Sequence, residues 1–353
     1  MKVILYTHDL SKIGGIETAF YNLSQYLTAK GYEVGVRYNR VAAMQIQRYR
    51  EAGIDIKREQ QEVCDILIIG SVYRRPRNIF GRVVVQQVHA DWSDEFWNGA
   101  DVAKKLIAKA SLESDLFAGV SKSSSKFVAD LVDTPVIVMN NLAPEQSEHI
   151  YNSGNKKLVI AAFTRMTSEK GLKNYEALRD RLKELKIDAE LRVYTSGDAP
   201  DGWQAYEPVP DIRTEFPQID FVASLADTES FGYTIAEANS CSIPVIIKRS
   251  NSTCEFFDDE SNLIIDKVSD ITEKDLYRKY KSNYKLREIS EKSIDEGMKT
   301  IEKLVKKKVI LKSNKTFYDV KAKKQRLAGE IFSVPTSRAK ELLRNKIKLV
   351  QVL

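Results

Sequence analysis

Short apolar runs alternate with longer amphipathic stretches along most of this chain. In the first half, strand-sized apolar runs are separated by stretches with helical spacing, such as residues 17–31 and 100–114. The predicted strands of this half are residues 2–7, 33–38, 64–70, 83–88, 116–120 and 136–139. This alternation predicts a parallel sheet with helices on both faces, because parallel strands need a crossover connection.

The same alternation begins again after a polar segment at residues 151–157. The second set of predicted elements comprises strands at 158–163, 191–195, 219–226 and 244–248 and helices at 174–185 and 233–241, and a charged helical stretch at 273–308 follows them. The sequence therefore predicts two Rossmann-like α/β domains that face each other across a cleft. The expected domains are residues 1–150, residues 151–305 and a small third unit at residues 306–353.

Composition narrows the class of protein. The chain has 353 residues, of which 43% are apolar and 29% charged, as in ordinary soluble globular proteins. Its longest apolar runs are strand-sized, so no transmembrane segment is expected, and Met1 leads directly into a predicted strand without a signal peptide. Cys64, Cys241 and Cys254 form no Cys-x-x-Cys pair, which favours reduced thiols in the cytoplasm and no zinc site.

Positive charge is concentrated at the C-terminal end. From Lys306 onward there are 14 Lys and Arg against three acidic residues, net +11, whereas the residues before it carry net −5. This tail contains short β-like pieces and one short helical stretch at residues 336–345, and we interpret it as a small basic β-rich module. Such a charge excess makes nucleic acid a possible partner.

Two glutamates flank a turn in the second half. Glu229 is predicted to lie in the loop after the strand at 219–226, and Glu237 in the helix that follows. Ligands of open parallel sheets bind at the carboxyl ends of the strands, so both carboxylates are expected to reach one site. Carboxylates accept hydrogen bonds from sugar hydroxyls, and the Ser-Phe-Gly turn offers backbone amides to a phosphate. The pattern is typical of a nucleotide-sugar site.

Two other segments offer groups for a phosphorylated ligand. Arg165 and Lys170 lie in the loop after the strand at 158–163, where their charges suit phosphate oxygens. Gly14 and Gly15 form a turn that opens a helix, and small residues there let backbone amides approach an anion or a sugar. The turn lacks the G-x-G-x-x-G spacing of dinucleotide binders, which disfavours an NAD enzyme.

The sequence around the two glutamates resembles a known family. Glu229-Ser-Phe-Gly232, Glu237-Ala238 and Ile243-Pro244-Val245 are similar to the E-x-F-G, E-A and G-x-P-V signature of the retaining GT-B glycosyltransferases of the family 4 type. Ser242 stands where that signature usually has Gly. The resemblance covers about residues 1–305 and implies a nucleotide-diphosphate sugar as donor substrate, with no cofactor and no metal.

The resemblance also implies roles for individual residues. Arg165 and Lys170 would bind the diphosphate, and Glu229 would contact the donor sugar. The donor would further contact the amides near Phe231 and Gly232, the turn at Gly14 and Gly15, and, through its ribose, Glu237. His89 and Asp91 follow a predicted strand and would contact the sugar or the acceptor.

Several acceptors remain open at this stage. The tail resembles a module of phage structural proteins that is also appended to bacterial surface-polysaccharide glycosyltransferases, so a bacterial surface glycan is the leading acceptor. An alternative acceptor is a base of phage DNA, with the basic tail bound to the phosphates. An alternative function is that of a virion or scaffold protein that uses its cleft to bind carbohydrate. An epimerase that acts on a nucleotide sugar is a weaker alternative. The oligomeric state is left open.

Overall fold

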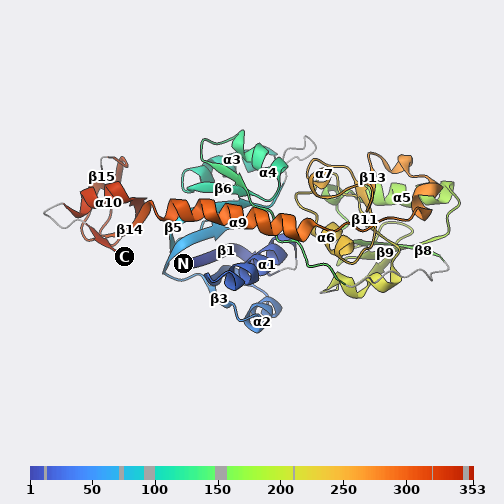
Figure 1. Cartoon of the computed structure of the whole chain (residues 1–353), viewed down its shortest axis with the longest axis horizontal. Helices are drawn as coiled ribbons and strands as arrows, with labels where there is room; N and C mark the ends of the chain where they lie inside the picture. The colour runs from blue at the N-terminus through green and yellow to red at the C-terminus, as the bar shows by residue number, and fades with distance from the viewer. Residues whose placement is uncertain are drawn as a thin grey trace.

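The structure is a computed structural model, and it describes residues 1–11, 14–70, 75–90, 100–147, 157–209, 211–319, 321–344 and 350–353. Figure 1 shows an elongated molecule with three parts along its length. The first half of the chain occupies the middle, the second half lies at one end, and the C-terminal module lies at the other end.

The N-terminal domain is built on a parallel sheet. Within the described residues this sheet has seven strands in the order β3-β2-β1-β4-β5-β6-β7. The strands are β1 (Lys2–Leu10), β2 (Glu33–Val41), β3 (Asp55–Arg58), β4 (Glu62–Ile69), β5 (Ile79–Val88), β6 (Leu116–Gly119) and β7 (Val136–Val138). The helices are α1 (Gly15–Ala29), α2 (Ala43–Glu51), α3 (Ala100–Ser111) and α4 (Lys122–Ala129).

The apolar runs form strands because both faces of the sheet are covered. Val3 and Leu5 of β1 pack with Phe20 of α1 in one apolar cluster, whereas Ile4 and Tyr6 of the same strand belong to a cluster on the opposite face. Alternate side chains of a strand point to opposite faces, so a strand buried on both sides must be apolar throughout. This explains the continuous apolar sequence of β1.

The C-terminal domain repeats this architecture. Its sheet has six parallel strands in the order β10-β9-β8-β11-β12-β13 within the described residues. They are β8 (Leu158–Phe163), β9 (Ala189–Tyr194), β10 (Gln204–Tyr206), β11 (Phe221–Ser224), β12 (Val245–Lys248) and β13 (Leu263–Ile265). The α-helices are α5 (Leu172–Glu184), α6 (Tyr233–Ser240), α7 (Thr253–Phe256) and α8 (Glu273–Tyr277), and the 3-10 turns are η1 (Ser168–Lys170), η2 (Ile212–Thr214), η3 (Phe216–Gln218) and η4 (Val268–Asp270). The predicted α/β class with two parallel sheets is confirmed.

One long helix returns from the second half of the chain to the first. Helix α9 (Leu286–Val305) begins in the core of the C-terminal domain, where Leu286 is buried, and continues over the N-terminal sheet. Ile294 and Met298 lie in the same apolar cluster as β1 and α1. Gly297 lets the helix approach Met139, because a Cβ atom there would lie 3.0 Å from the Met139 Cγ atom. Helix α9 therefore packs on both domains, whereas the predicted boundary assigns it to the second.

The predicted helical stretch at residues 273–308 is two helices rather than one. Helix α8 ends at Tyr277 and α9 begins at Leu286. Between them the chain is held by tyrosine hydroxyls, because Tyr280 donates to the Asp275 carbonyl at 2.9 Å and Tyr284 donates to the Pro144 carbonyl at 2.7 Å. The sequence does not indicate this interruption, because charged residues continue through residues 278–285 and the hydrogen bonds of the two tyrosines cannot be predicted from the charge pattern.

The C-terminal module follows α9 directly. An antiparallel sheet in the order β17-β14-β18 and a hairpin of β15 and β16 surround one short helix. The elements are β14 (Lys308–Ser313), β15 (Phe317–Asp319), β16 (Lys324–Arg326), β17 (Ile331–Pro335), α10 (Thr336–Leu343) and β18 (Val350–Val352). The module packs on β5, where the Ser333 hydroxyl donates to the Arg82 carbonyl at 2.8 Å and Lys308 pairs with Asp115. The small β-rich module predicted from the sequence is confirmed, and its sheet is antiparallel.

Candidate active site

Two loops at neighbouring strand ends bring a lysine and a glutamate together. Strands β8 and β11 are adjacent in the C-terminal sheet, so the loops that follow them are also neighbours. Lys170 lies in the loop after β8 and Glu229 in the loop after β11. The Lys170 Nζ atom is 3.6 Å from the Glu229 Oε2 atom, and the two side chains are 31% and 23% exposed. The pair is thus within reach of a bound ligand.

A close approach of the two backbones fixes this arrangement. Gly171 has φ +79°, and a Cβ atom there would lie 2.2 Å from the Leu225 carbonyl oxygen. The Asn174 side chain donates to the same carbonyl at 2.8 Å. Only glycine fits a backbone contact of this kind, so Gly171 places Lys170 against the loop that carries Glu229.

Local contacts at Glu229 and at Gly232 fix the conformation of the Glu229 loop. The Ser230 amide donates to the Glu229 Oε1 atom at 2.9 Å, which leaves Oε2 toward Lys170. Gly232 precedes α6 with φ +79°, and a Cβ atom there would lie 2.9 Å from the Ile235 side chain. Phe231 is 1% exposed and its side chain belongs to the domain core. The predicted contact at Phe231 can therefore involve only its backbone.

Glu237 is half-buried on α6 and has an unusual acidity. Desolvation raises its pKa to about 7, and the positive charges of Arg213 and Arg48 only partly offset this effect. Arg213 holds Asp211 in a bidentate pair, with Arg213 Nε 2.8 Å from Asp211 Oδ1 and Nη2 2.7 Å from Oδ2. The Glu237 carboxylate therefore faces a charged group from its own domain and one from α2 of the N-terminal domain.

The groups around Glu237 were not predicted from the sequence. Arg48, Asp211 and Arg213 lie on α2 and at η2, far from Glu237 along the chain and in no recognisable motif. The sequence around a charged residue in a polar helix or turn does not indicate which distant residue it will contact. Asp211 and Arg213 come close to Glu237 through the folding of the C-terminal domain, and Arg48 does so only across the domain junction.

His89 comes from the N-terminal domain, directly after β5. Its carbonyl accepts a hydrogen bond from the Ser230 hydroxyl at 2.7 Å, so it lies next to the Glu229 loop. Its ring packs edge-on against Phe20 at a centroid distance of 5.9 Å, and burial lowers the pKa of the imidazole to about 3. Neither ring nitrogen has a hydrogen-bond partner within the described part of the chain. A neutral imidazole with unused polar atoms suits contact with a hydroxyl.

The other predicted residues are placed as follows. The Arg165 side chain is exposed on the Lys170 loop. Gly14 caps α1 in extended geometry, and a Cβ atom added there would lie 2.8 Å from the Glu17 carboxylate, whereas among the described residues nothing lies within 4 Å of a Cβ atom added at Gly15. Asp91 lies outside the described residues. Of the residues predicted from the second half, Lys170 and Glu229 are in contact, Arg165 and Phe231 lie in the same two loops, and Glu237 lies on the helix that follows.

A second set of contacts joins the two domains. The Glu255 carboxylate of the C-terminal domain accepts hydrogen bonds from the backbone amides of Lys122 at 2.8 Å and Ser123 at 2.7 Å. These amides begin α4 of the N-terminal domain, where unpaired N–H groups favour an anion. Beside them, the fully buried hydroxyls of Ser121 and Ser252 are 3.2 Å apart. We refer to these contacts of Glu255, Lys122, Ser123, Ser121 and Ser252 as the interdomain clasp.

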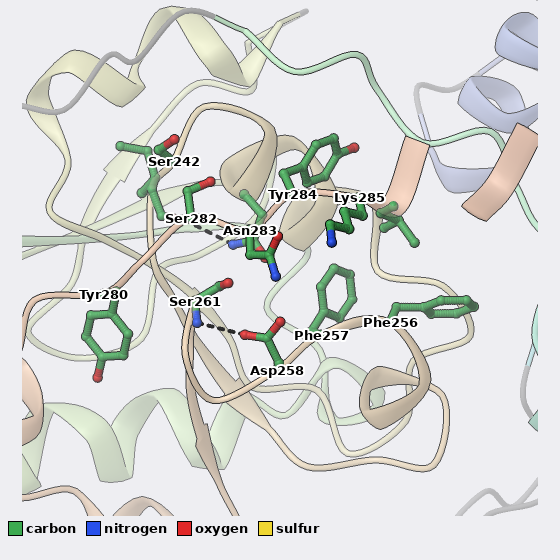
Figure 2. Close-up of a pocket in the computed structure, with 13 residues that line it drawn as sticks. Ser242, Phe256, Phe257, Asp258, Ser261, Tyr280, Ser282, Asn283, Tyr284 and Lys285 are labelled. Atoms are coloured by element: carbon green, nitrogen blue, oxygen red, sulfur yellow. Dashed lines mark hydrogen bonds between the residues drawn. The ribbon is translucent and has the colours of Figure 1, made fainter. Parts of the chain in front are cut away.

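Figure 2 shows a pocket elsewhere in the C-terminal domain. Tyr280 and Tyr284 line it together with Asp258, whose carboxylate accepts from the Ser261 amide at 2.8 Å. Its volume of about 30 Å³ holds little more than a water molecule. Asp258 and Ser261 precede β13, so the pocket lies at the opposite end of the strands from Lys170 and Glu229. It is not the site predicted from the sequence.

The described residues contain no group of three or more His, Cys, Asp or Glu side chains placed to hold a metal ion. Among the same residues, every helix is too short or too polar to cross a bilayer.

Comparison with solved structures defines the fold as GT-B. HepE from Anabaena in complex with UDP-glucose matches with a TM-score of 0.58 and 14% identity, over 86% of this chain and 93% of that one. A TarM variant of S. aureus in complex with Fondaparinux, alpha-GlcNAc-glycerol and UDP matches with a TM-score of 0.60 and 9% identity, over 86% and 98%. WaaG, a glycosyltransferase involved in lipopolysaccharide biosynthesis, matches with a TM-score of 0.55 and 11% identity, over 86% and 98%. The sequence matches no protein-family model and no curated protein.

Proposed function

We propose that this protein is a retaining glycosyltransferase of the family 4 type that transfers a hexose from a nucleotide-diphosphate sugar. The observation that carries the proposal is the Lys170–Glu229 pair, 3.6 Å apart at two strand ends and next to His89. A cation for phosphate, a carboxylate for sugar hydroxyls and a neutral imidazole from the facing domain are the groups that glycosyl transfer needs. The fold shared with HepE and TarM, crystallised with UDP-glucose and UDP respectively, makes UDP-sugars the first donors to test.

In the proposed reaction, the bond between the anomeric carbon and the diphosphate oxygen breaks while the acceptor oxygen bonds to the same face of that carbon. The acceptor hydroxyl gives its proton to the departing phosphate oxygen. Lys170 and Arg165 stabilise the charge that grows on the diphosphate, an effect that is large when the donors are preorganised. Glu229 holds the sugar hydroxyls, and Glu237 accepts from the ribose. His89 and Asp91 contact the sugar or the acceptor.

Positive side chains supply the charge compensation in this scheme, so we propose that no metal ion is needed. We further propose a surface glycan as acceptor and a cytoplasmic location. Cys64, Cys241 and Cys254 are all unpaired, as expected for a reducing compartment. Two of these thiols, those of Cys64 and Cys241, are buried.

The experiment is a panel of nucleotide sugars tested with the purified full chain. The true donor raises the melting temperature by mass action and is slowly hydrolysed, with and without EDTA. An α-linked donor must give an α-linked product, which proton NMR reads from the anomeric coupling. Lys170→Ala and Glu229→Gln are the site variants, and Lys183→Ala on an exposed turn of α5 is the matched control. A β-linked product would refute retention, and the absence of any donor-dependent shift would refute the function.

A further inference from the structure

The charge of the C-terminal module is distributed in an unusual way. All three acidic residues of the module are engaged by arginines: Arg338 contacts Asp319 at 2.7 Å and Glu341 at 2.8 Å, and Arg326 contacts Glu330 at 2.7 Å. The Arg338–Asp319 pair joins α10 to the β15–β16 hairpin, whereas the other two pairs are local, within α10 and at the end of β16. Two of the module's three arginines are thus engaged by its own carboxylates.

The lysines that remain point to solvent. Five exposed lysines of the module have no acidic partner among the described residues: Lys306, Lys307, Lys315, Lys323 and Lys340. The rest of the chain is net negative. An anionic surface would therefore attract this end of the molecule and repel the remainder.

Exposed apolar side chains gather on the same module. Of the eleven large apolar side chains that are exposed in the described residues, five belong to the module, which is about a seventh of the chain. They are Tyr318, Leu327, Leu343, Val352 and Leu353. Such a concentration on a module that already has its own buried core indicates a surface that meets another phase or molecule.

The β15–β16 hairpin shows how the two features combine. Tyr318 pairs with Gln325 in the hairpin, and Leu327 directly follows the end of β16. Tyr318 is 61% and Leu327 59% exposed, whereas Asp319 and Arg326, which lie on the other face, are buried. Lys323 lies at the hairpin turn and Lys315 at its base. The hairpin face that carries Tyr318, which we call the outer face, is therefore exposed, with Leu327 directly after β16 and a lysine close to each end of the hairpin.

We propose that the C-terminal module docks on an anionic membrane surface through the outer face of this hairpin and its flanking lysines. Lysines attract acidic headgroups while tyrosine and leucine side chains enter the headgroup boundary. Duplex DNA fits less well, because arginine is the preferred residue for phosphate and base contacts and two of the module's three arginines are committed to internal carboxylates.

The position of the module leaves the glycosyltransferase site free. Helix α9 has 20 residues and runs from the domain junction to the module (Figure 1). At a rise of 1.5 Å per residue, the length of α9 separates the domain junction from the module by about 30 Å. Membrane docking is therefore independent of the proposed donor site, and the two proposals can fail separately.

The test is flotation of the full chain with vesicles of phosphatidylcholine and phosphatidylglycerol, against vesicles of phosphatidylcholine alone. We expect binding only to the anionic vesicles, with an affinity that falls as salt rises. Each lysine near an anionic surface contributes about fivefold, so the Lys315→Gln, Lys323→Gln double variant loses about twenty-five-fold in affinity. The matched control exchanges two exposed lysines of the body, Lys105 and Lys109, for Gln and keeps its affinity.

A second variant tests the apolar part of the surface. Tyr318→Ser with Leu327→Ser leaves the charge unchanged and lowers the affinity for anionic vesicles at least several-fold, whereas Leu112→Ser, at a residue that is 85% exposed on the body, has no effect. Equal loss in the body-lysine control, equal binding to neutral vesicles, or binding to duplex DNA without vesicle binding would each overturn the proposal. Unchanged melting temperatures show that the variants remain folded.

Discussion

The two Rossmann-like domains bring different kinds of group to their junction. The C-terminal domain presents ionised side chains at the ends of its strands, with Lys170 and Glu229 in direct contact and Asp211 paired with Arg213. The N-terminal domain presents the His89 imidazole, which burial keeps neutral, next to the Glu229 loop, and it places Arg48 near Glu237. The same α/β scaffold thus sets fixed charges, which suit a phosphorylated donor, opposite a neutral imidazole, which suits a sugar or acceptor hydroxyl.

The largest expected effect tests the charged side of this comparison. Lys170→Ala removes a cation from the position where phosphate charge develops, so kcat for transfer should fall by about a hundredfold to a thousandfold. Steady-state kinetics with the donor found by the panel measures this fall. Lys183→Ala, a change of the same chemistry on an exposed turn of α5, should leave kcat unchanged. Equal activity of the two variants would mean that Lys170 does not bind the diphosphate.

The second prediction concerns donor affinity. Glu237→Ala removes an acceptor for ribose hydroxyls, and charge-assisted hydrogen bonds contribute about 1.5–3 kcal/mol each, so the donor KM should rise by about tenfold to a hundredfold. The kcat value should change less. The exposed Glu296 on α9 gives the control Glu296→Ala. A Glu237→Ala variant whose donor KM equals that of the control would show that Glu237 does not bind the donor.

The acidity of Glu237 gives a prediction for stability. Its pKa is raised from 4.5 to about 7, so the folded protein keeps a proton that the unfolded chain releases in this range. The stability that Glu237 contributes is therefore present below pH 4.5 and is lost as the pH rises through 7. Glu237→Gln should melt at the wild-type temperature near pH 5 and above it near pH 8. Identical melting temperatures at both pH values would argue that the carboxylate is well solvated.

A smaller effect is expected at the interdomain clasp. Glu255→Gln weakens two charge-assisted hydrogen bonds to the start of α4 and should destabilise the contact between the domains by about 2 kcal/mol. Small-angle X-ray scattering should then show a larger radius of gyration, and the donor panel should show weaker binding. Glu260→Gln, at an exposed residue of the same domain, is the control. An unchanged radius would indicate that α9 alone sets the domain arrangement.

The smallest effect is expected at Ser242, where the family signature usually has Gly. Ser242 has φ +61°, in the left-handed region that favours glycine. Ser242→Gly should relieve this strain and stabilise the protein by about 1 kcal/mol, measured by denaturant unfolding. Ser269→Gly, in a turn with ordinary φ, should destabilise instead. A loss of stability in Ser242→Gly would mean that its side chain makes a compensating contact.

Local patterns predicted most of the elements because each depends on nearby residues. The apolar run of β1 needs only burial on both faces, and Gly232 marks the start of α6 through its backbone freedom. The same reasoning fails for residues 278–285, where the Tyr284 hydroxyl binds the carbonyl of Pro144, 140 residues away, and for Arg48, which meets Glu237 only across the domain junction.

The sequence alone determined the two α/β units, the position of the glutamates after β11 and the basic character of the last residues. Periodicity, turn residues and charge depend only on the order of residues along the chain. Tertiary structure decided that Lys170 contacts Glu229, that His89 is neutral and that α9 joins both domains. The physical reason is that contact distances and desolvation depend on which segments meet in space, and neighbours in sequence do not specify that.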